Sequence, residues 1–133
     1  MKNLQLSLKT KWFEMTVSGI KTEDYREITP YWCNRLLLID GEIKPKEWWE
    51  KYLNWYRKVD LLKMIDMDDN MQPNFSFKEF ETNTITLGYP KSGDTERILK
   101  LEHKGIRVRT GNSDWGAEVN RLYFVILHGY SVE

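Results

Sequence analysis

The chain opens with alternating apolar and polar residues, a pattern that predicts a half-buried β-strand. Leu4, Leu6 and Leu8 alternate with polar neighbours, and a strand turns successive side chains to opposite faces. A short helix is expected next, with Thr10 as its N-cap and Gly19 just past its end, where glycine readily adopts a left-handed backbone. The start of the chain therefore predicts a strand, a short helix and a glycine turn.

A second strand is predicted over residues 21–28. If its pairing is regular, Thr22, Asp24 and Arg26 share one face, because side chains alternate along a strand. Residues 32–39 fit either a short helix, for which Pro30 is a suitable start, or an extended apolar segment. The type of this element stays open.

The clearest helix is predicted from Pro45 to about Asp66, because apolar residues recur there every three or four positions. Apolar side chains at helical spacing usually pack in a core. The helix could instead form a platform for flat ligands, cap a cleft or mediate self-association. Its apolar residues are Trp48, Trp49, Tyr52, Leu53, Trp55, Tyr56, Val59 and Leu62.

Beyond a polar loop at 66–74, short apolar runs predict strands at 75–80, 84–89, 98–101, 105–109 and 122–127. Glycine and proline place turns at 88–94 and 110–114. Consecutive short strands with turn-length connections favour a mixed or antiparallel barrel over a doubly wound sheet. The predicted fold class is α+β, a β-barrel with a short first helix and a long aromatic helix.

Size and composition narrow the picture. A chain of 133 residues can bury one core, so a single domain spanning 1–133 is expected. Twenty basic and twenty acidic residues cancel, which argues against a broad basic face for nucleic acid and leaves room for a local pocket. The single cysteine, Cys33, and the lack of a long apolar run predict a soluble, cytoplasmic protein with no membrane partner.

The segment GIKTEDYR, residues 19–26, resembles the motif of the ASCH family. In that motif a lysine lies two residues after a glycine, and an acidic residue and an arginine follow, separated by one position. The preceding LSLKTKWF, residues 6–13, is similar to the first strand and helix of the family. Residues 111–118 and 123–129 are similar to the closing strands of a phage and bacterial branch.

The resemblance implies a PUA-like barrel whose cleft lies beside the first helix and the second strand, with about residues 44–70 as a helical insertion. It also implies RNA binding or, in one branch, hydrolysis of acylated cytidine. The family usually has glutamate where this chain has Asp24, a change that keeps the charge and shortens the reach by one methylene.

The motif supplies Lys21, Thr22, Asp24, Tyr25 and Arg26 as candidate ligand-binding residues. On a regular strand Asp24 can orient the Arg26 guanidinium, whose donors suit a phosphate or a base edge. Lys21 can point into the same cleft, where burial beside another cation would lower its pKa. The alternative is a plain surface ion pair between Asp24 and Arg26.

Three further ligand-binding candidates, Arg109, Asn112 and Trp115, lie near a turn in the second half. Trp115 can either stack on a base or plug the end of the barrel, and the strand face of Arg109 can be merely solvated. Cys33, His103 and His128 lack metal-ligand spacing, so no metal is expected, and His128 is interpreted as structural. No phosphate loop or dinucleotide fingerprint is present, so no cofactor is expected.

Two functions stay open. As a binding module, the barrel would hold RNA, a nucleotide or a nucleoside, with Lys21 and Arg26 on phosphate or base edge and an aromatic ring stacked on the base. As a small amidohydrolase it would act on an acylated nucleoside such as N4-acetylcytidine, with Lys21 and Asp24 catalytic. The hydrolytic branch has threonine in place of Asp24 and a later glutamate with no match here, so binding is the leading prediction. The oligomeric state is not predicted.

Overall fold

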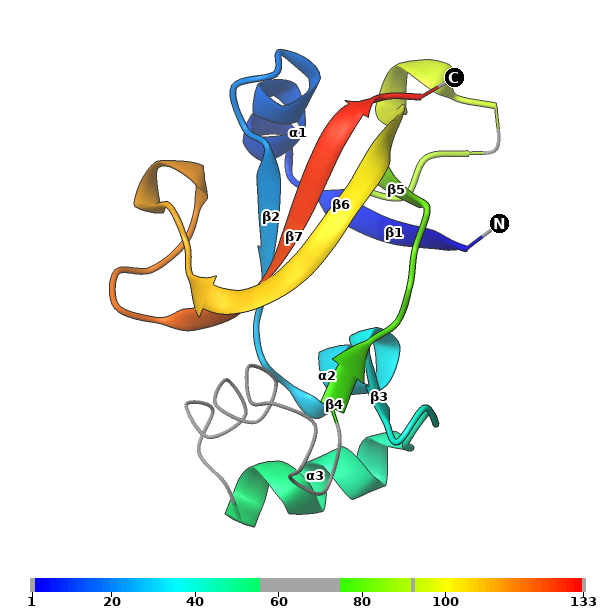
Figure 1. Cartoon of the computed structure of the whole chain (residues 1–133). Coiled ribbons are helices and arrows are strands. Elements are labelled where there is room, and N and C mark those ends of the chain that lie inside the picture. Colours follow the sequence, from blue (N-terminus) through cyan, green and yellow to red (C-terminus); the bar gives the residue numbers. More distant parts are fainter. Residues whose placement is uncertain (1, 56–74, 92, 133) are drawn as a thin grey trace.

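A single curled β-sheet organises the structure, a computed structural model that describes residues 2–55, 75–91 and 93–132 (Figure 1). Its strand order is β1-β5-β6-β7-β2. β1 pairs in parallel with β5, and the other neighbours pair antiparallel. The predicted α+β class with a mixed sheet is confirmed, and the curl is compatible with a barrel-like fold. The strands are β1 Asn3–Leu8, β2 Glu23–Arg26, β5 Thr82–Leu87, β6 Ile98–Thr110 and β7 Leu122–Ser131.

A smaller group of elements lies at one end of the sheet, and α1 lies at the other (Figure 1). In this group β3 pairs antiparallel with β4, and α2 packs on α3. Within the described ranges, no helix is both long enough and apolar enough to cross a membrane. The elements are α1 Thr10–Val17, α2 Pro30–Leu36, β3 Leu37–Ile39, α3 Lys46–Trp55 and β4 Phe75–Phe77, with short turns η1 Thr95–Arg97 and η2 Ser113–Trp115 on either side of β6.

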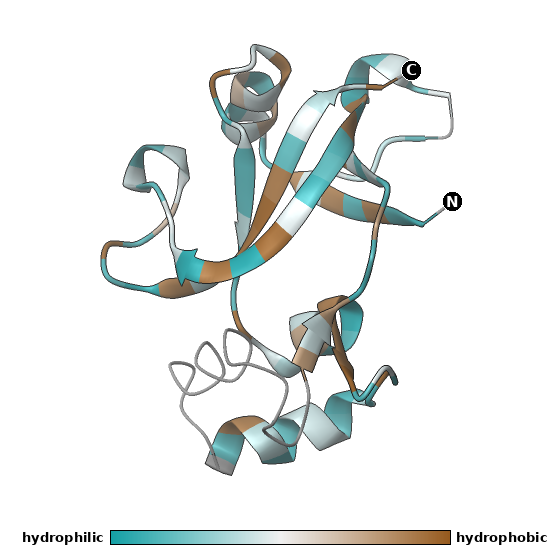
Figure 2. Cartoon of the chain, viewed as in Figure 1, coloured by the Kyte–Doolittle hydropathy of each residue, from teal (hydrophilic) through white to brown (hydrophobic). Residues whose placement is uncertain are grey.

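The alternation predicted for the first strand is confirmed. Leu4, Leu6 and Leu8 are buried in β1, and the residues between them are exposed. Figure 2 shows a similar alternation of polar and apolar positions along much of β6. In β7, by contrast, residues 123–126 are all buried, as expected where both faces of a strand are covered.

The region predicted as two strands, 98–101 and 105–109, is the single 13-residue strand β6. The polar residues Glu102, His103 and Lys104 interrupt the apolar pattern, which is why the continuity was missed. Register irregularities against β7 lie on both sides of His103. Since a β-bulge re-aims a side chain, this distortion matters for where His103 points.

Helix α1 ends as glycine at position 19 predicts. Gly19 has a φ of 83°, and the Gly19 and Ile20 amides donate to the carbonyls of Thr16 and Met15 at 3.1 Å, which is a Schellman motif. The Lys21 amide also donates to the Met15 carbonyl, at 3.0 Å. The predicted N-cap is off by one residue, because Lys9 precedes the helix and Thr10 is its first residue.

The open segment at 32–39 contains both a helix and a strand, since α2 begins at Pro30 and β3 follows at Leu37. The aromatic helix is confirmed over Lys46–Trp55 as α3, and the rest of the predicted helix lies outside the described residues. Trp49 and Tyr52 are buried in the core, so the packing interpretation holds for both of these rings.

Candidate functional site

Lys21 and Asp24 form a buried ion pair at the start of β2, and each side chain is only 2% exposed. Lys21 Nζ also donates to the Glu23 carbonyl at 2.7 Å. Burial lowers the pKa of Lys21, and the Asp24 carboxylate opposes that change. The glycine turn after α1 carries the lysine into the interior, so the side chain of this motif residue is buried.

The second oxygen of Asp24 binds a residue that was interpreted as merely structural. Asp24 Oδ2 lies 2.6 Å from His128 Nε2, and the His128 side chain is 2% exposed. Burial alone would raise the pKa of Asp24, but hydrogen bonds and charge from His128 and Lys21 hold it below its ordinary value. The carboxylate is therefore ionised and fully engaged inside the protein.

Arg26 does not take up the expected pairing with Asp24. Its Nη1 donates to the Tyr25 carbonyl at 2.9 Å, and its Nη2 donates to the Ser7 carbonyl at 3.0 Å. Burial lowers the pKa of Arg26, the Asp24 charge raises it and the Arg35 charge lowers it. The charge of Asp24 therefore acts on Arg26, but the Arg26 guanidinium does not bind the carboxylate. It lines a separate hollow.

That space is a hollow of about 560 Å³, here named the arginine–aromatic hollow. Helix α2 supplies three lining residues, Tyr31, Trp32 and Arg35, because positions three and four apart share a helix face. The helix is held at its start by Thr29, whose hydroxyl accepts from the Trp32 amide at 3.3 Å. The hollow is lined by Gln5, Ser7, Arg26, Tyr31, Trp32, Arg35 and Tyr89.

Two guanidinium groups and flat rings meet in this hollow. The Arg26 and Arg35 Cζ atoms each lie 5.3 Å from the centre of the Trp32 ring, and Arg35 Cζ lies 5.5 Å from that of Tyr31. None of the lining residues is acidic. Arg35 Nε is buried and has no hydrogen-bond partner in the described part of the chain. The hollow is therefore locally electropositive although the chain has no net charge.

A third set of candidates gathers around Glu23. Arg109 Nη2 lies 2.6 Å from Glu23 Oε2, and the Tyr25 hydroxyl donates to Glu23 Oε1 at 2.6 Å. The same hydroxyl accepts from the Asn112 amide at 2.9 Å. Burial and the Glu23 carboxylate raise the pKa of Tyr25. The structure thus brings Tyr25, Arg109 and Asn112 together, with Glu23 binding both Arg109 and Tyr25, and Tyr25 binding the Asn112 amide.

The two remaining candidates, Thr22 and Trp115, belong to none of these three groups of residues. Thr22 is exposed just before β2, and Trp115 is half-buried in η2. Trp12 packs close to Gly116 Cα, so that a Cβ at position 116 would lie 3.1 Å from the indole ring. The predicted site residues therefore divide into a buried pair, one arginine at a hollow, a cluster around Glu23 and two separate residues.

The polar network around Asp24 continues across the sheet. His128 Nδ1 on β7 lies 2.7 Å from Asn83 Nδ2 on β5, and Asn83 Oδ1 lies 2.7 Å from His103 Nδ1 on β6. His103 and His128 face each other in the β6–β7 register. The chain of contacts therefore links the buried lysine of the motif to His103, one side chain from each of four strands taking part.

The sequence missed Trp32, Arg35, Asn83 and His103 as functional candidates. Trp32 and Arg35 share a face only if residues 30–36 are helical, and the sequence there fits an extended segment as well. Asn83 and His103 meet through long-range strand pairing, for which the sequence carries no local signal. Within the described ranges, no three His, Cys, Asp or Glu side chains gather to hold a metal ion.

Comparison with protein-family models, with curated proteins and with solved structures gives no match. The function of this chain therefore has to follow from the arrangement of its own residues.

Proposed function

We propose that the chain binds a nucleotide, or one nucleotide of single-stranded RNA, in the arginine–aromatic hollow. One observation carries this proposal: Arg26 and Arg35 both lie over Trp32 in a hollow that no acidic residue lines. A guanidinium fork suits a phosphate, and an aromatic ring suits the flat face of a base.

The resemblance to the ASCH motif supports the same proposal. Arg26 is the arginine of that motif, and it is the motif residue that lines the hollow. We propose on this basis that the curled sheet is a PUA-like barrel and that the segment of about 44–70 is an insertion. A local pocket also agrees with the zero net charge, since one phosphate needs only nearby cations.

The hydrolase alternative depends on Lys21 and Asp24. Both side chains are 2% exposed and bind each other, and neither lines the arginine–aromatic hollow. A catalytic base must reach the proton that it removes, directly or through one water. We therefore expect binding without turnover of N4-acetylcytidine, and release of cytidine by the wild-type protein would favour the hydrolase instead.

Binding should be tested with a fluorescein-labelled single-stranded RNA of mixed sequence, by fluorescence anisotropy at low salt. We expect Arg35→Gln and Tyr31→Ala each to weaken binding about 5- to 100-fold, because a lost stack or charged contact costs roughly 1–3 kcal/mol. Tyr31 is 50% exposed, so its removal should leave the fold intact.

The matched control is Arg97→Gln, which removes one positive charge from an exposed arginine outside the hollow. This variant should bind the RNA as the wild type does. An equal loss in Arg97→Gln and Arg35→Gln would show only a general charge effect. No binding by the wild-type protein, to RNA or to a nucleoside 5′-monophosphate, would end the proposal.

A further inference from the structure

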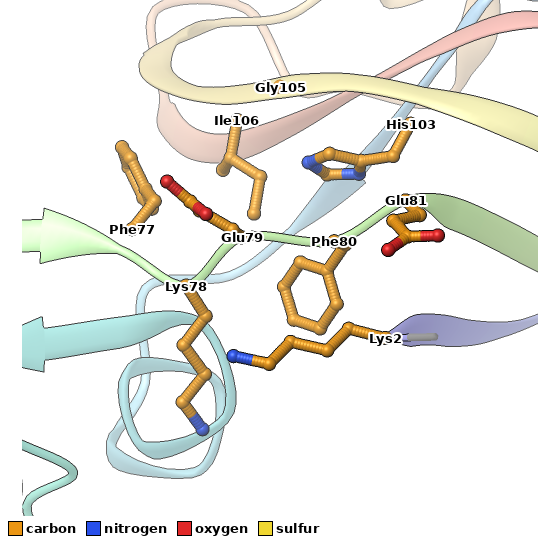
Figure 3. Close-up of a pocket in the computed structure, with 9 residues that line it drawn as sticks. All are labelled: Lys2, Phe77, Lys78, Glu79, Phe80, Glu81, His103, Gly105 and Ile106. Atoms are coloured by element: carbon orange, nitrogen blue, oxygen red, sulfur yellow. The ribbon is translucent and has the colours of Figure 1, made fainter.

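A second hollow, here named the His103 hollow, opens between β6 and the segment that joins β4 to β5 (Figure 3). Its volume is about 720 Å³, and it shares no lining residue with the arginine–aromatic hollow. It is lined by Lys2, Phe77, Lys78, Glu79, Phe80, Glu81, His103, Gly105 and Ile106.

Asn83 fixes the position of a proton on His128. Asn83 Nδ2 lies 3.2 Å from the Leu127 carbonyl, and a carbonyl can only accept, so this atom is the amide nitrogen and donates. The same nitrogen lies 2.7 Å from His128 Nδ1, which must therefore carry a lone pair. The His128 proton is then on Nε2, where it is donated to Asp24 at 2.6 Å.

The other end of the Asn83 amide fixes His103 in turn. Asn83 Oδ1 accepts and lies 2.7 Å from His103 Nδ1, so Nδ1 carries the proton. In a neutral imidazole the second nitrogen is then an acceptor. No hydrogen bond among the described residues uses His103 Nε2, and Figure 3 shows the imidazole pointing toward Ile106 and Glu79 at the hollow.

Burial lowers the pKa of His103, and a positive charge on His128 would lower it further. The neutral form therefore prevails at neutral pH, and Nε2 is available as an acceptor. The register of β6 against β7 shifts on both sides of His103, and a distortion of this kind can re-aim a side chain. The backbone distortion and the hydrogen bond with Asn83 therefore both act on the orientation of the His103 ring.

Rings and lysines complete the hollow. The Phe80 ring meets the His103 ring edge to face, with centroids 5.4 Å apart, and Phe77 also lines the space. Burial and the charges of Arg35 and Lys2 lower the pKa of Lys78, and Lys78 Nζ donates to the Asn34 carbonyl at 2.9 Å. Neither lysine forms an ion pair with another described residue. The hollow is therefore lined by the His103 acceptor, the carboxylates of Glu79 and Glu81, apolar rings and ammonium donors.

We infer that the His103 hollow binds a small planar lactam, whose ring N–H donates to His103 Nε2 and whose carbonyl accepts from a lysine ammonium. A flat ring fits between apolar walls, and a lactam carries one N–H donor and one carbonyl acceptor, which suit His103 Nε2 and the Lys2 ammonium. This inference goes beyond the proposed function, because it uses a different hollow and different residues. Asn83 is here a positioning residue, since it acts through His103.

The test uses 2-pyridone as the probe and N-methyl-2-pyridone as a matched ring that lacks only the N–H donor. The full chain, labelled with ¹⁵N in its histidine side chains, is titrated at about pH 7.5 by NMR. We expect the His103 Nε2 resonance to have the unprotonated position and to shift saturably with 2-pyridone. N-methyl-2-pyridone should bind at least about tenfold more weakly, since it leaves the acceptor unpaired.

Two variants keep the inference falsifiable. His103→Phe keeps a ring and removes the acceptor, so the folded variant should lose 2-pyridone binding, measured by calorimetry. Lys2→Ala, at an exposed position, should weaken it severalfold. Equal binding of both pyridones, a protonated Nε2 in the free protein, or unchanged binding by His103→Phe would each overturn the inference.

The inference can fail separately from the proposed function. Arg35→Gln should bind 2-pyridone as the wild type does, and His103→Phe should keep its RNA binding. Binding of 2-pyridone should also weaken as the pH falls, because a protonated Nε2 no longer accepts. The charged and titratable groups around His103 are Lys2, Lys78, Glu79 and Glu81 at the hollow, His128 on β7, and Glu102 and Lys104 on β6.

Discussion

The Lys21–Asp24 and Arg121–Glu27 pairs join the same kinds of charge in opposite surroundings. The first pair is 2% exposed on both sides, whereas Arg121 and Glu27 are 33% and 55% exposed. Removing one partner of a buried pair leaves the other charge uncompensated, which costs about 3–5 kcal/mol. An exposed pair is screened by water and contributes at most about 1 kcal/mol.

Asp24→Asn should therefore lower the free energy of unfolding by roughly 3–5 kcal/mol, measured by urea denaturation at neutral pH. Glu27→Gln, the matched change at the surface, should lower it by less than about 1 kcal/mol. Similar losses in the two variants would mean that burial does not control the contribution of the Lys21–Asp24 pair.

At this scale the sequence identified residues near the motif and missed their partners. Lys21, Asp24 and Arg26 could be named because they share one short segment. His128 and Asn83 bind to this group from strands more than 50 residues away, so only the register of the sheet reveals them. The expected contact between Asp24 and Arg26 did not form, since the buried carboxylate has two closer partners.

Helix α3 contributes to the structure through one face. Trp49 is fully buried and packs against Tyr52 and Phe75, with ring centroids 5.7 and 6.0 Å away. Trp48 is half-buried and stacks on Tyr52 at 5.4 Å. The two adjacent tryptophans therefore differ in how much apolar surface they remove from water.

Trp49→Ala should lower the free energy of unfolding by about 3–5 kcal/mol, because a buried aromatic side chain leaves a cavity. Trp48→Ala should cost clearly less. Trp49→Phe should also cost less than Trp49→Ala, since it refills most of the space and removes an indole N–H that is buried without a partner among the described residues. Thermal unfolding followed by circular dichroism would rank the three variants, and a larger loss in Trp48→Ala would contradict the assignment of faces.

Elements with a strong local pattern could be predicted from the sequence. The first strand, α1 and the described part of α3 each have a clear period or an end signal, such as Gly19. β6 was divided in error, because the polar residues of its bulge resemble a connection. α2 stayed uncertain because seven residues give too few turns to show a helical period.

The whole molecule should become less stable as the pH falls through the range in which His103 titrates. The pKa of His103 is lowered in the folded protein, whereas the unfolded chain keeps the ordinary value near 6.5. Between these two values the unfolded state holds more protons, so acidification favours unfolding. The charged and titratable groups around His103 are Lys2, Lys78, Glu79, Glu81, Glu102, Lys104 and His128.

We expect the melting temperature of the wild type to fall between about pH 7.5 and pH 5.5, and that of His103→Phe to fall less. Scanning calorimetry of both proteins across this range gives the comparison. If the melting temperatures of the two proteins fall in parallel with pH, His103 does not cause the pH dependence of stability. The wild-type profile alone is not sufficient, because it sums the titration of every group in the chain.

The overall sheet order was beyond the reach of the sequence. Alternation predicts a strand and its buried face but does not choose its neighbour. The parallel pairing of β1 with β5 joins Asn3 to Thr82, and the intervening helices give no local sign of it. The sequence also showed no sign of the electropositive arginine–aromatic hollow. The net charge of zero is a sum over the whole chain and does not show where charges of one sign gather.

The position of β2 at the edge of the sheet has a consequence for how the protein is made. β2 pairs with β7 alone, and β1 pairs with β5 alone. During synthesis the motif segment, residues 19–26, therefore leaves the ribosome long before β7, the strand that pairs with β2. Its geometry can form only after residues 122–131 have left the exit tunnel. Shortening the chain by about a dozen residues at its C-terminus should therefore disorder the region around Lys21 and Asp24, about a hundred positions upstream.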